Sequence, residues 1–166
     1  MVADEMTQVA VVGAGLIGHG IAQVFARAGH HVRLTSRSEA SLERATGRIE
    51  SNLRMLTEMG SITRQDADLT ISNIDPTMEF EKAVGDAGVV FEAVYEDLDL
   101  KHDLFRRLDE ACGEHAILAS STSTFTATQL GSATGHPDRV VVAHFINPPY
   151  LMPLVEVVPG IGTSRE

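Results

Sequence analysis

A glycine-rich turn near the start of this chain limits the folds that are open to it. The turn reads Gly13-Ala14-Gly15-Leu16-Ile17-Gly18 and directly follows the apolar run of residues 8–12. Apolar residues then recur at helical spacing until Gly29. A glycine loop between a buried strand and a helix is typical of dinucleotide-binding domains, because backbone N–H groups and the helix dipole there face the pyrophosphate.

Each glycine of this loop has its own expected task. Gly13 permits the tight turn, Gly15 lets the backbone approach the pyrophosphate, and Gly18 lets the helix pack closely on the strand. We therefore predict that Gly13, Gly15, Leu16, Ile17 and Gly18 bind the cofactor. A glycine-rich turn without a ligand is the alternative, and the flanking strand, helix and second strand argue against it.

Strand and helix patterns alternate along the rest of the chain. Strands are expected at residues 31–35, 69–72, 88–92, 116–119, 140–143 and 155–158, and helices at 38–60, after Thr63, at 97–111 and at 127–133. This order predicts an α/β fold of the Rossmann type, with a doubly wound, mostly parallel sheet and a single domain. Residues 1–160 are expected to form the dinucleotide-binding domain, and residues 161–166 to begin a linker.

Composition excludes several other classes of protein. The net charge is −10 and no cluster of lysine and arginine opposes it, so we expect no nucleic acid partner. No apolar run is long enough for a membrane span, and the first residues carry no basic secretion signal, so a cytoplasmic setting is expected. The single cysteine, Cys112, excludes an internal disulfide framework, and we interpret it as a packing residue. No metal site is expected, because the histidines other than His144 show no ligand spacing and are taken as structural or solvated: His19, His30, His31, His102, His115 and His136.

The end of the second strand bears on which dinucleotide binds. An acidic residue there accepts the ribose 2′-OH of NAD and repels the 2′-phosphate of NADP. This chain has Ser36 at that position, followed by Arg37. A hydroxyl and a guanidinium suit a 2′-phosphate, so NADP is expected beside NAD; equally, Arg37 can be a solvated residue near a helix start.

The second half of the chain contains a histidine–carboxylate pattern that suits alcohol oxidation. His144 ends one expected strand and Glu156 lies on the next, so the two side chains can come within hydrogen-bond reach. Oxidation of a secondary alcohol needs a base for the hydroxyl proton, and an imidazole can accept that proton near neutral pH. A carboxylate on its other ring nitrogen fixes the tautomer and stabilises the imidazolium.

Three segments together resemble the 3-hydroxyacyl-CoA dehydrogenase family. They are Glu92-Ala93-Val94-Tyr95-Glu96-Asp97-Leu98, Ser120-Ser121-Thr122-Ser123, and His144-Phe145-Ile146-Asn147-Pro148-Pro149-Tyr150 with Pro153-Leu154-Val155-Glu156. The likeness runs from the glycine loop to Val158. It implies an NAD(P)-dependent enzyme that oxidises a 3-hydroxyacyl group to a 3-oxoacyl group in fatty acid metabolism.

The resemblance also implies roles for individual residues. His144 is the general base and Glu156 its orienting partner. Ser123 holds the substrate oxygen, and Asn147 positions substrate and nicotinamide, so these two also border the cofactor.

Three further residues match family positions near the ribose of the cofactor. They are Ala93, Glu96 and Lys101. For Glu96 and Lys101 the alternative is that they are ordinary charges at a helix start.

Two departures from the family pattern leave alternatives open. Residues 51–61 contain no lysine, whereas acyl-CoA members carry lysines there that meet the CoA phosphates. This looks more like the branch with L-gulonate 3-dehydrogenase (lambda-crystallin), whose substrate would be a small free 3-hydroxy acid, L-gulonate- or carnitine-like. A non-catalytic nucleotide-sensing module is the second alternative.

The second departure is length, since family members continue into a helical C-terminal domain that closes the substrate pocket. We therefore expect cofactor binding with little or no dehydrogenase activity by this chain alone. A homodimer is expected only with that further domain.

Overall fold

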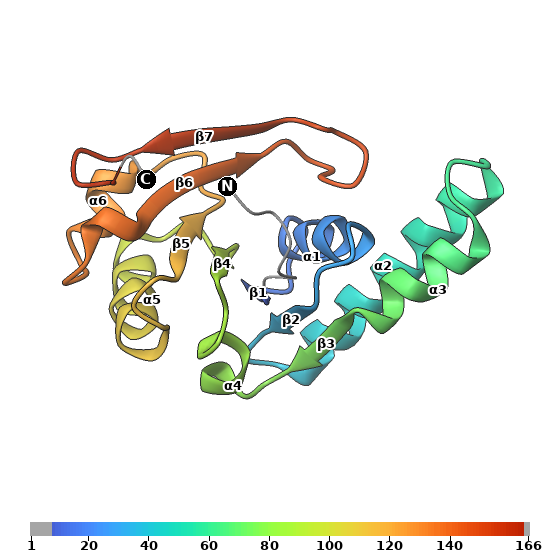
Figure 1. The fold of residues 1–166 in the computed structure, drawn as a ribbon, viewed down its shortest axis with the longest axis horizontal. Coiled ribbons are helices and arrows are strands. Elements are labelled where there is room, and N and C mark those ends of the chain that lie inside the picture. Colours follow the sequence, from blue (N-terminus) through green and yellow to red (C-terminus); the bar gives the residue numbers. More distant parts are fainter. Residues whose placement is uncertain (1–7, 165–166) are drawn as a thin grey trace.

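Seven strands form one sheet in the order β3-β2-β1-β4-β5-β6-β7 (Figure 1). The computed structural model describes residues 8–164. Its strands are β1 (Val9–Val12), β2 (Val32–Thr35), β3 (Ile74–Thr77), β4 (Val89–Glu92), β5 (Ile117–Ser120), β6 (Val140–Phe145) and β7 (Val155–Pro159). All neighbours pair in parallel except β6 and β7, which are antiparallel. The predicted doubly wound, mostly parallel sheet is therefore confirmed.

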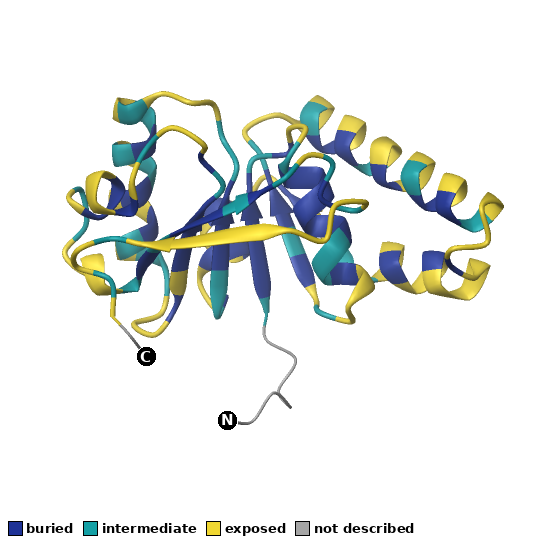
Figure 2. Cartoon of the chain, turned by 90° about the horizontal axis from the view of Figure 1, so that it is seen from above, coloured by how far each residue is buried: buried dark blue, intermediate teal, exposed yellow. Residues whose placement is uncertain are grey.

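Helices cover both faces of this sheet (Figure 2). They are α1 (Gly18–Arg27), α2 (Glu39–Glu58), α3 (Arg64–Ser72), α4 (Phe80–Val84), α5 (Leu98–Ala111), α6 (Ala127–Gly131) and the 3₁₀ turn η1 (Pro137–Arg139). None of these helices is long and apolar enough to cross a membrane. Side chains alternate along a strand, so Val9 and Val11 pack with α1 and α2, whereas Ala10 and Val12 pack with α4, α5 and α6.

The strand predicted at residues 69–72 is wrong, because these residues end helix α3. Thr63 begins that helix with a capping box: its hydroxyl accepts from the backbone N–H of Asp66, and the Asp66 carboxylate accepts from the backbone N–H of Thr63. Leu69 is 54% exposed, so the apolar pattern there does not mark a buried strand. The strand follows at Ile74–Thr77, on the sheet edge, where Pro76 is tolerated without its N–H.

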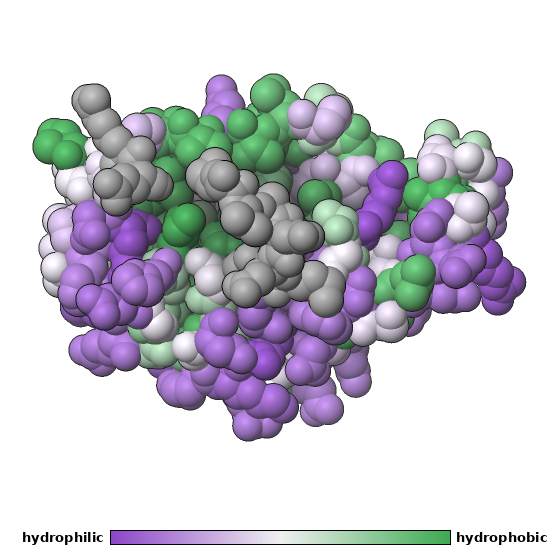
Figure 3. All heavy atoms as spheres, in the orientation of Figure 1, coloured by the Kyte–Doolittle hydropathy of each residue, from purple (hydrophilic) through white to green (hydrophobic). Residues whose placement is uncertain are grey.

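Strand β7 lies at the opposite edge of the sheet and is exposed along its whole length. Its valines, Val155, Val157 and Val158, belong to an apolar surface that also includes Leu154. Figure 3 shows hydrophobic side chains gathered along the side of the molecule where β7 runs. Strand β6, by contrast, is mostly buried, so the last two strands differ in their surroundings.

The chain after β7 returns to the body of the domain. The backbone N–H of Ile161 donates to Thr128 Oγ1, the Thr163 hydroxyl donates to the Val140 carbonyl, and the Ser164 N–H donates to the Asp138 carbonyl. Residues 160–164 therefore lie against α6 and η1. The linker expected from residue 161 onward stays a prediction.

Cys112 follows α5 and packs partly buried against the α4–α6 side of the sheet, as predicted. Burial raises the pKa of its thiol from 9.0 to about 11, which lowers the thiolate fraction at neutral pH about a hundredfold. We expect alkylation of the folded protein by iodoacetamide at pH 7.5 to be slower than in urea by at least about that factor, because the thiolate is the nucleophile. Equal rates, measured by mass spectrometry, would contradict the buried position.

Candidate active site

The glycine loop begins where the ends of β1 and β4 touch. Gly13 has a φ of 111°, a conformation that side-chain-bearing residues rarely adopt. A Cβ on Gly13 would lie 2.5 Å from the Ala93 carbonyl oxygen. The Gly13 N–H donates to the Thr35 carbonyl at 2.9 Å, and the Ala93 N–H donates to the Val12 carbonyl at 2.8 Å. The ends of β1, β2 and β4 are thus joined through one turn.

Gly18 packs as closely as expected, and Gly15 stands in open space. A Cβ on Gly18 would lie 1.8 Å from the Gly13 carbonyl oxygen, so α1 starts directly against the loop. Gly15 has no atom within 4 Å of a built Cβ and faces a pocket. The N-cap residue of α1, Ile17, makes no side-chain cap hydrogen bond. Its backbone can therefore meet an anion, as a pyrophosphate requires.

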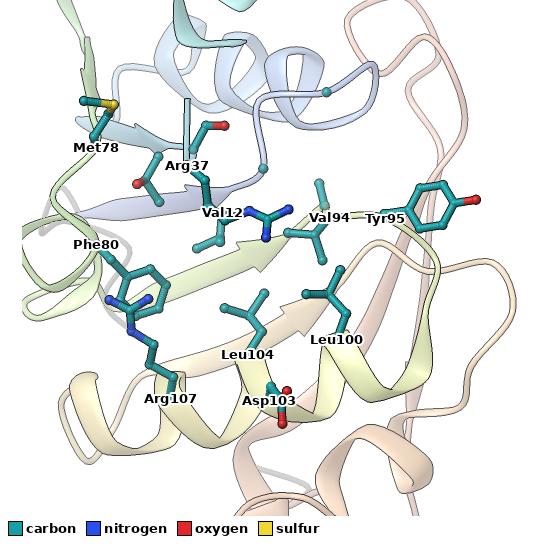
Figure 4. Close-up of a pocket in the computed structure, with 15 residues that line it drawn as sticks. Val12, Arg37, Met78, Phe80, Val94, Tyr95, Leu100, Asp103, Leu104 and Arg107 are labelled. Carbon is teal, nitrogen blue, oxygen red and sulfur yellow. The ribbon is translucent and has the colours of Figure 1, made fainter. Parts of the chain in front are cut away.

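A pocket of about 480 Å³ opens at the carboxyl ends of β1, β2 and β4 (Figure 4). Strands β1 and β4 are neighbours whose connections run to opposite sides, which is the point where open α/β sheets bind ligands. The pocket walls are largely apolar: Val12, Met78, Phe80, Leu100 and Leu104. These walls suit the flat adenine ring, and the adjoining loop suits the phosphates, so the residues present fit a dinucleotide.

Most of the predicted cofactor residues lie around this pocket. Gly13, Gly15, Ser36, Arg37 and Ala93 line it together. Leu16 and Ile17 lie in the loop beside it, with Leu16 58% exposed. The structure places these residues as a cofactor site needs them, while their roles stay predictions.

His144 and Glu156 occupy opposite positions in the antiparallel pair of β6 and β7. Their side chains meet, with His144 Nδ1 donating to Glu156 Oε2 at 2.9 Å. Nε2 is thereby left as the unprotonated nitrogen of the neutral ring. The contact expected from the sequence is present, and its geometry suits a histidine that accepts a proton.

Ser123 and Asn147 lie on the same side of the sheet as this pair, where the parallel strands end. Ser123 is exposed in the loop after β5, and Asn147 is exposed just after β6. Because β4, β5 and β6 are parallel, their carboxyl ends bring both loops to the side where the glycine loop lies.

Lys101 is fully buried, so it is not the ordinary solvated charge at a helix start that was its alternative interpretation. Its Nζ donates to Glu92 Oε1 at 2.5 Å, and neither side chain has exposed surface. Glu92 also accepts from the Ser120 hydroxyl at 2.5 Å and from the Val94 N–H at 2.8 Å. A buried ion pair persists only when its remaining polar atoms are satisfied in this way.

The same network reaches Glu96 at the surface. Lys101 Nζ lies 3.7 Å from Glu96 Oε1, and the Thr122 hydroxyl donates to Glu96 Oε2 at 2.7 Å. The loops after β4 and β5 are therefore held together, and the second loop carries Ser123. Glu92 and Thr122 were not predicted as site residues; their one signal in the sequence is a single acid at the end of an otherwise apolar strand.

His19, expected to be structural or solvated, is buried at the glycine loop. Its Nδ1 lies 2.9 Å from the Gly15 carbonyl oxygen, and its Nε2 lies 3.4 Å from Asn52 Nδ2 on α2. Asn52 Nδ2 also donates to Gln23 Oε1 at 3.0 Å. Burial lowers the pKa of His19 below 6.5, against the opposing effect of the Gly15 hydrogen bond. The neutral ring therefore braces the loop against α2.

Replacing Lys101 tests the buried network. We expect Lys101→Met to lower the free energy of unfolding by about 3–5 kcal/mol, because it leaves the Glu92 carboxylate buried without a partner. Urea denaturation measures this. Lys82→Met is the matched control, since Lys82 pairs with Glu79 at 3.7 Å on the surface and should cost less than about 1 kcal/mol. Similar losses in the two variants would overturn the assignment.

His19 makes stability depend on pH. Its pKa is lower in the folded state than in the unfolded state, so the unfolded state takes up the proton first as pH falls. The contribution of His19 is complete above pH 6.5 and declines below it, toward the folded pKa. We expect His19→Asn, which keeps a donor for the Gly15 carbonyl, to flatten this decline in urea titrations between about pH 7 and pH 5. An unchanged decline would show that other groups cause it.

Comparison with known proteins places this geometry in a family. Residues 8–166 match the family model described as "3-hydroxyacyl-CoA dehydrogenase, NAD binding domain". The 3-hydroxybutyryl-CoA dehydrogenase of Clostridioides difficile is 37% identical over 158 residues, which cover 95% of this chain and 56% of that protein. The mitochondrial hydroxyacyl-coenzyme A dehydrogenase of Sus scrofa is 39% identical over 163 residues, covering 95% of this chain and 52% of that protein.

A solved structure agrees with these matches. The crystal structure of 3-hydroxybutyryl-CoA dehydrogenase from Escherichia coli K12 superposes with a TM-score of 0.93 at 35% identity, over 97% of this chain and 34% of that one. The chain spans about half the length of the curated dehydrogenases above. It belongs to the 3-hydroxyacyl-CoA dehydrogenase family, of which it is the NAD-binding domain.

Proposed function

We propose that this domain serves an enzyme that oxidises a 3-hydroxyacyl-CoA to the 3-oxoacyl-CoA with NAD as hydride acceptor. The observation that carries the proposal is the His144–Glu156 pair, whose atoms lie 2.9 Å apart, on the side of the sheet where the parallel strands end and the glycine loop lies. A nucleotide-sensing module would need the loop alone. The pair favours catalysis, because Ser123 and Asn147 lie in the loops that follow the neighbouring strands β5 and β6.

The chain's own residues divide the reaction between them. Bound NAD supplies the acceptor for the hydride that leaves the carbon bearing the hydroxyl. His144 Nε2 takes the hydroxyl proton, and Glu156 keeps Nδ1 protonated and stabilises the resulting imidazolium. Ser123 holds the substrate oxygen, and Asn147 orients substrate and nicotinamide.

The cofactor is held by the loop and by the buried network behind it. Backbone of Gly13, Gly15 and α1 meets the pyrophosphate, and the apolar pocket takes the adenine. Glu96 borders the ribose, with Lys101 holding it from inside at 3.7 Å. In this role Lys101 is a positioning residue.

The proposal has two candidate substrates, a CoA ester and a free acid. The relatives named above are dehydrogenases of CoA esters, which favours a short 3-hydroxyacyl-CoA. The lack of lysine at residues 51–61, at the end of α2 and just after it, favours a small free 3-hydroxy acid, as in the L-gulonate 3-dehydrogenase branch. We propose the CoA ester first and the free acid second.

Assembly and location are also proposals. We place the homodimer contacts in the helical C-terminal domain expected for the family. The lone thiol of Cys112 suits a reducing compartment such as the cytoplasm.

Activity tests use the polypeptide encoded by the whole reading frame that contains these residues. We expect NADH formation from 3-hydroxybutyryl-CoA, and little from free 3-hydroxybutyrate or L-gulonate. His144→Gln and Glu156→Gln should each lower kcat by about 10²–10⁴-fold, because proton transfer loses its base or the base loses its tautomer.

His136→Gln is the matched control for these variants. His136 also pairs with a carboxylate, Asp109 at 3.0 Å, but lies at η1 away from the glycine loop. The His136→Gln variant should retain the kcat of the unaltered enzyme. Equal losses in all three variants would overturn the catalytic pair, whereas preference for a free acid would overturn only the substrate.

A further inference from the structure

The end of β2 presents no carboxylate to the pocket. Ser36 and Arg37 line it there, immediately after the last residue of the strand, Thr35. A carboxylate in this place would hydrogen-bond the ribose 2′-OH and repel a 2′-phosphate. Serine instead offers a hydroxyl, which donates to phosphate oxygens without repelling them.

Arg37 adds an uncompensated positive charge. Its side chain extends from the end of β2 into the pocket (Figure 4). Two other arginines of the chain are neutralised, since Arg33 pairs with Asp86 and Arg107 with Glu81. Within residues 8–164 the structure gives Arg37 no such ion pair. A guanidinium in this state can form a bidentate bond with a phosphate.

The charged side chains that line the pocket leave one unpaired charge, which is positive. Two guanidiniums line it, from Arg37 and Arg107, against one carboxylate, from Asp103. Asp103 lies on α5, opposite the end of β2, and pairs with Arg106 at 2.8 Å. The whole chain carries a net charge of −10. Because Arg107 pairs with Glu81 and Asp103 with Arg106, the unpaired charge among these three residues is that of Arg37.

Arg107 is placed to contribute a stacking surface. Its guanidinium lies 3.8 Å from the centroid of the Phe80 ring while it donates to Glu81 at 2.5 Å. Figure 4 shows the two side chains on the wall of the pocket that faces Arg37. An adenine between two guanidinium faces would be held without any acid at its ribose.

We propose that the adenosine end of this pocket accepts a 2′-phosphate through Ser36 and Arg37, so that the domain binds NADP(H) about as tightly as NAD(H) or more tightly. This goes beyond the family's NAD site, which the loop and the apolar walls already explain. The two residues determine specificity and take no part in the hydride transfer.

Binding measurements on the chain of residues 1–166 test the proposal without needing turnover. Isothermal titration of NADH and NADPH compares the two dinucleotides, and adenosine 2′,5′-bisphosphate against 5′-AMP isolates the adenosine end. We expect NADPH to bind within about threefold of NADH or more tightly, and the bisphosphate to bind about tenfold more tightly than 5′-AMP, because each added contact is charge-assisted.

Variants separate the two residues from the rest of the site. Arg37→Gln should weaken NADPH about tenfold or more and leave NADH within about twofold. Ser36→Asp should weaken NADPH further while retaining NADH, a reversal that unfolding cannot imitate. Arg64→Gln, an exposed arginine on α3, is the charge-matched control and should change neither.

Three outcomes would overturn the inference. The first is NADPH binding to the unaltered chain more than about threefold more weakly than NADH. The second is an equal effect of Arg37→Gln on both dinucleotides. The third, binding of neither dinucleotide, would overturn the family's cofactor site together with the inference, so the two kinds of failure can be told apart.

Discussion

The backbone contact between Gly13 and Ala93 is the constraint on which the site depends. A side chain on Gly13 would come within 2.5 Å of the Ala93 carbonyl oxygen, so the ends of β1 and β4 can meet only if that position carries none. Their meeting creates the crevice at the point where the sheet connections diverge. The pyrophosphate loop, the adenosine pocket and the first residues after β4 all take their places from this one contact.

A buried carboxylate, that of Glu92, stabilises the chain next to this contact. Glu92 immediately precedes Ala93, and its carboxylate is bound by Lys101, Ser120 and the Val94 N–H. Burying two charges is costly unless their hydrogen bonds are complete. Here the complete set of hydrogen bonds also holds the site together, because the partners of Glu92 lie on different segments of the chain. The cofactor crevice and the loop with Ser123 thereby become parts of one rigid arrangement.

The two ends of the site follow different physical rules. At the reaction end, His144 and Glu156 are matched by the register of two antiparallel strands, so their contact is set by backbone hydrogen bonds. At the adenosine end, Arg37 extends from a strand terminus into open space on a flexible stem. Precise placement suits proton transfer, whereas an adaptable guanidinium suits a phosphate that arrives with the ligand.

The sequence by itself determined the features that depend on neighbouring residues. The glycine loop, the helix start at Thr63 and the alternation of strands and helices are local, so they could be predicted. So could the contact of His144 with Glu156, once two adjacent strands were assumed. The strand misplaced to residues 69–72 failed because a local apolar pattern is the same on an exposed helix and in a buried strand. Only the tertiary structure decided that Lys101 and His19 are buried, that Glu92 anchors the loops, and that β7 pairs antiparallel. The burial of Lys101 and His19 and the role of Glu92 depend on contacts between separate segments of the chain, because burial arises from what those segments place around a residue. The pairing of β7 depends on how the connection from the preceding strand, β6, turns.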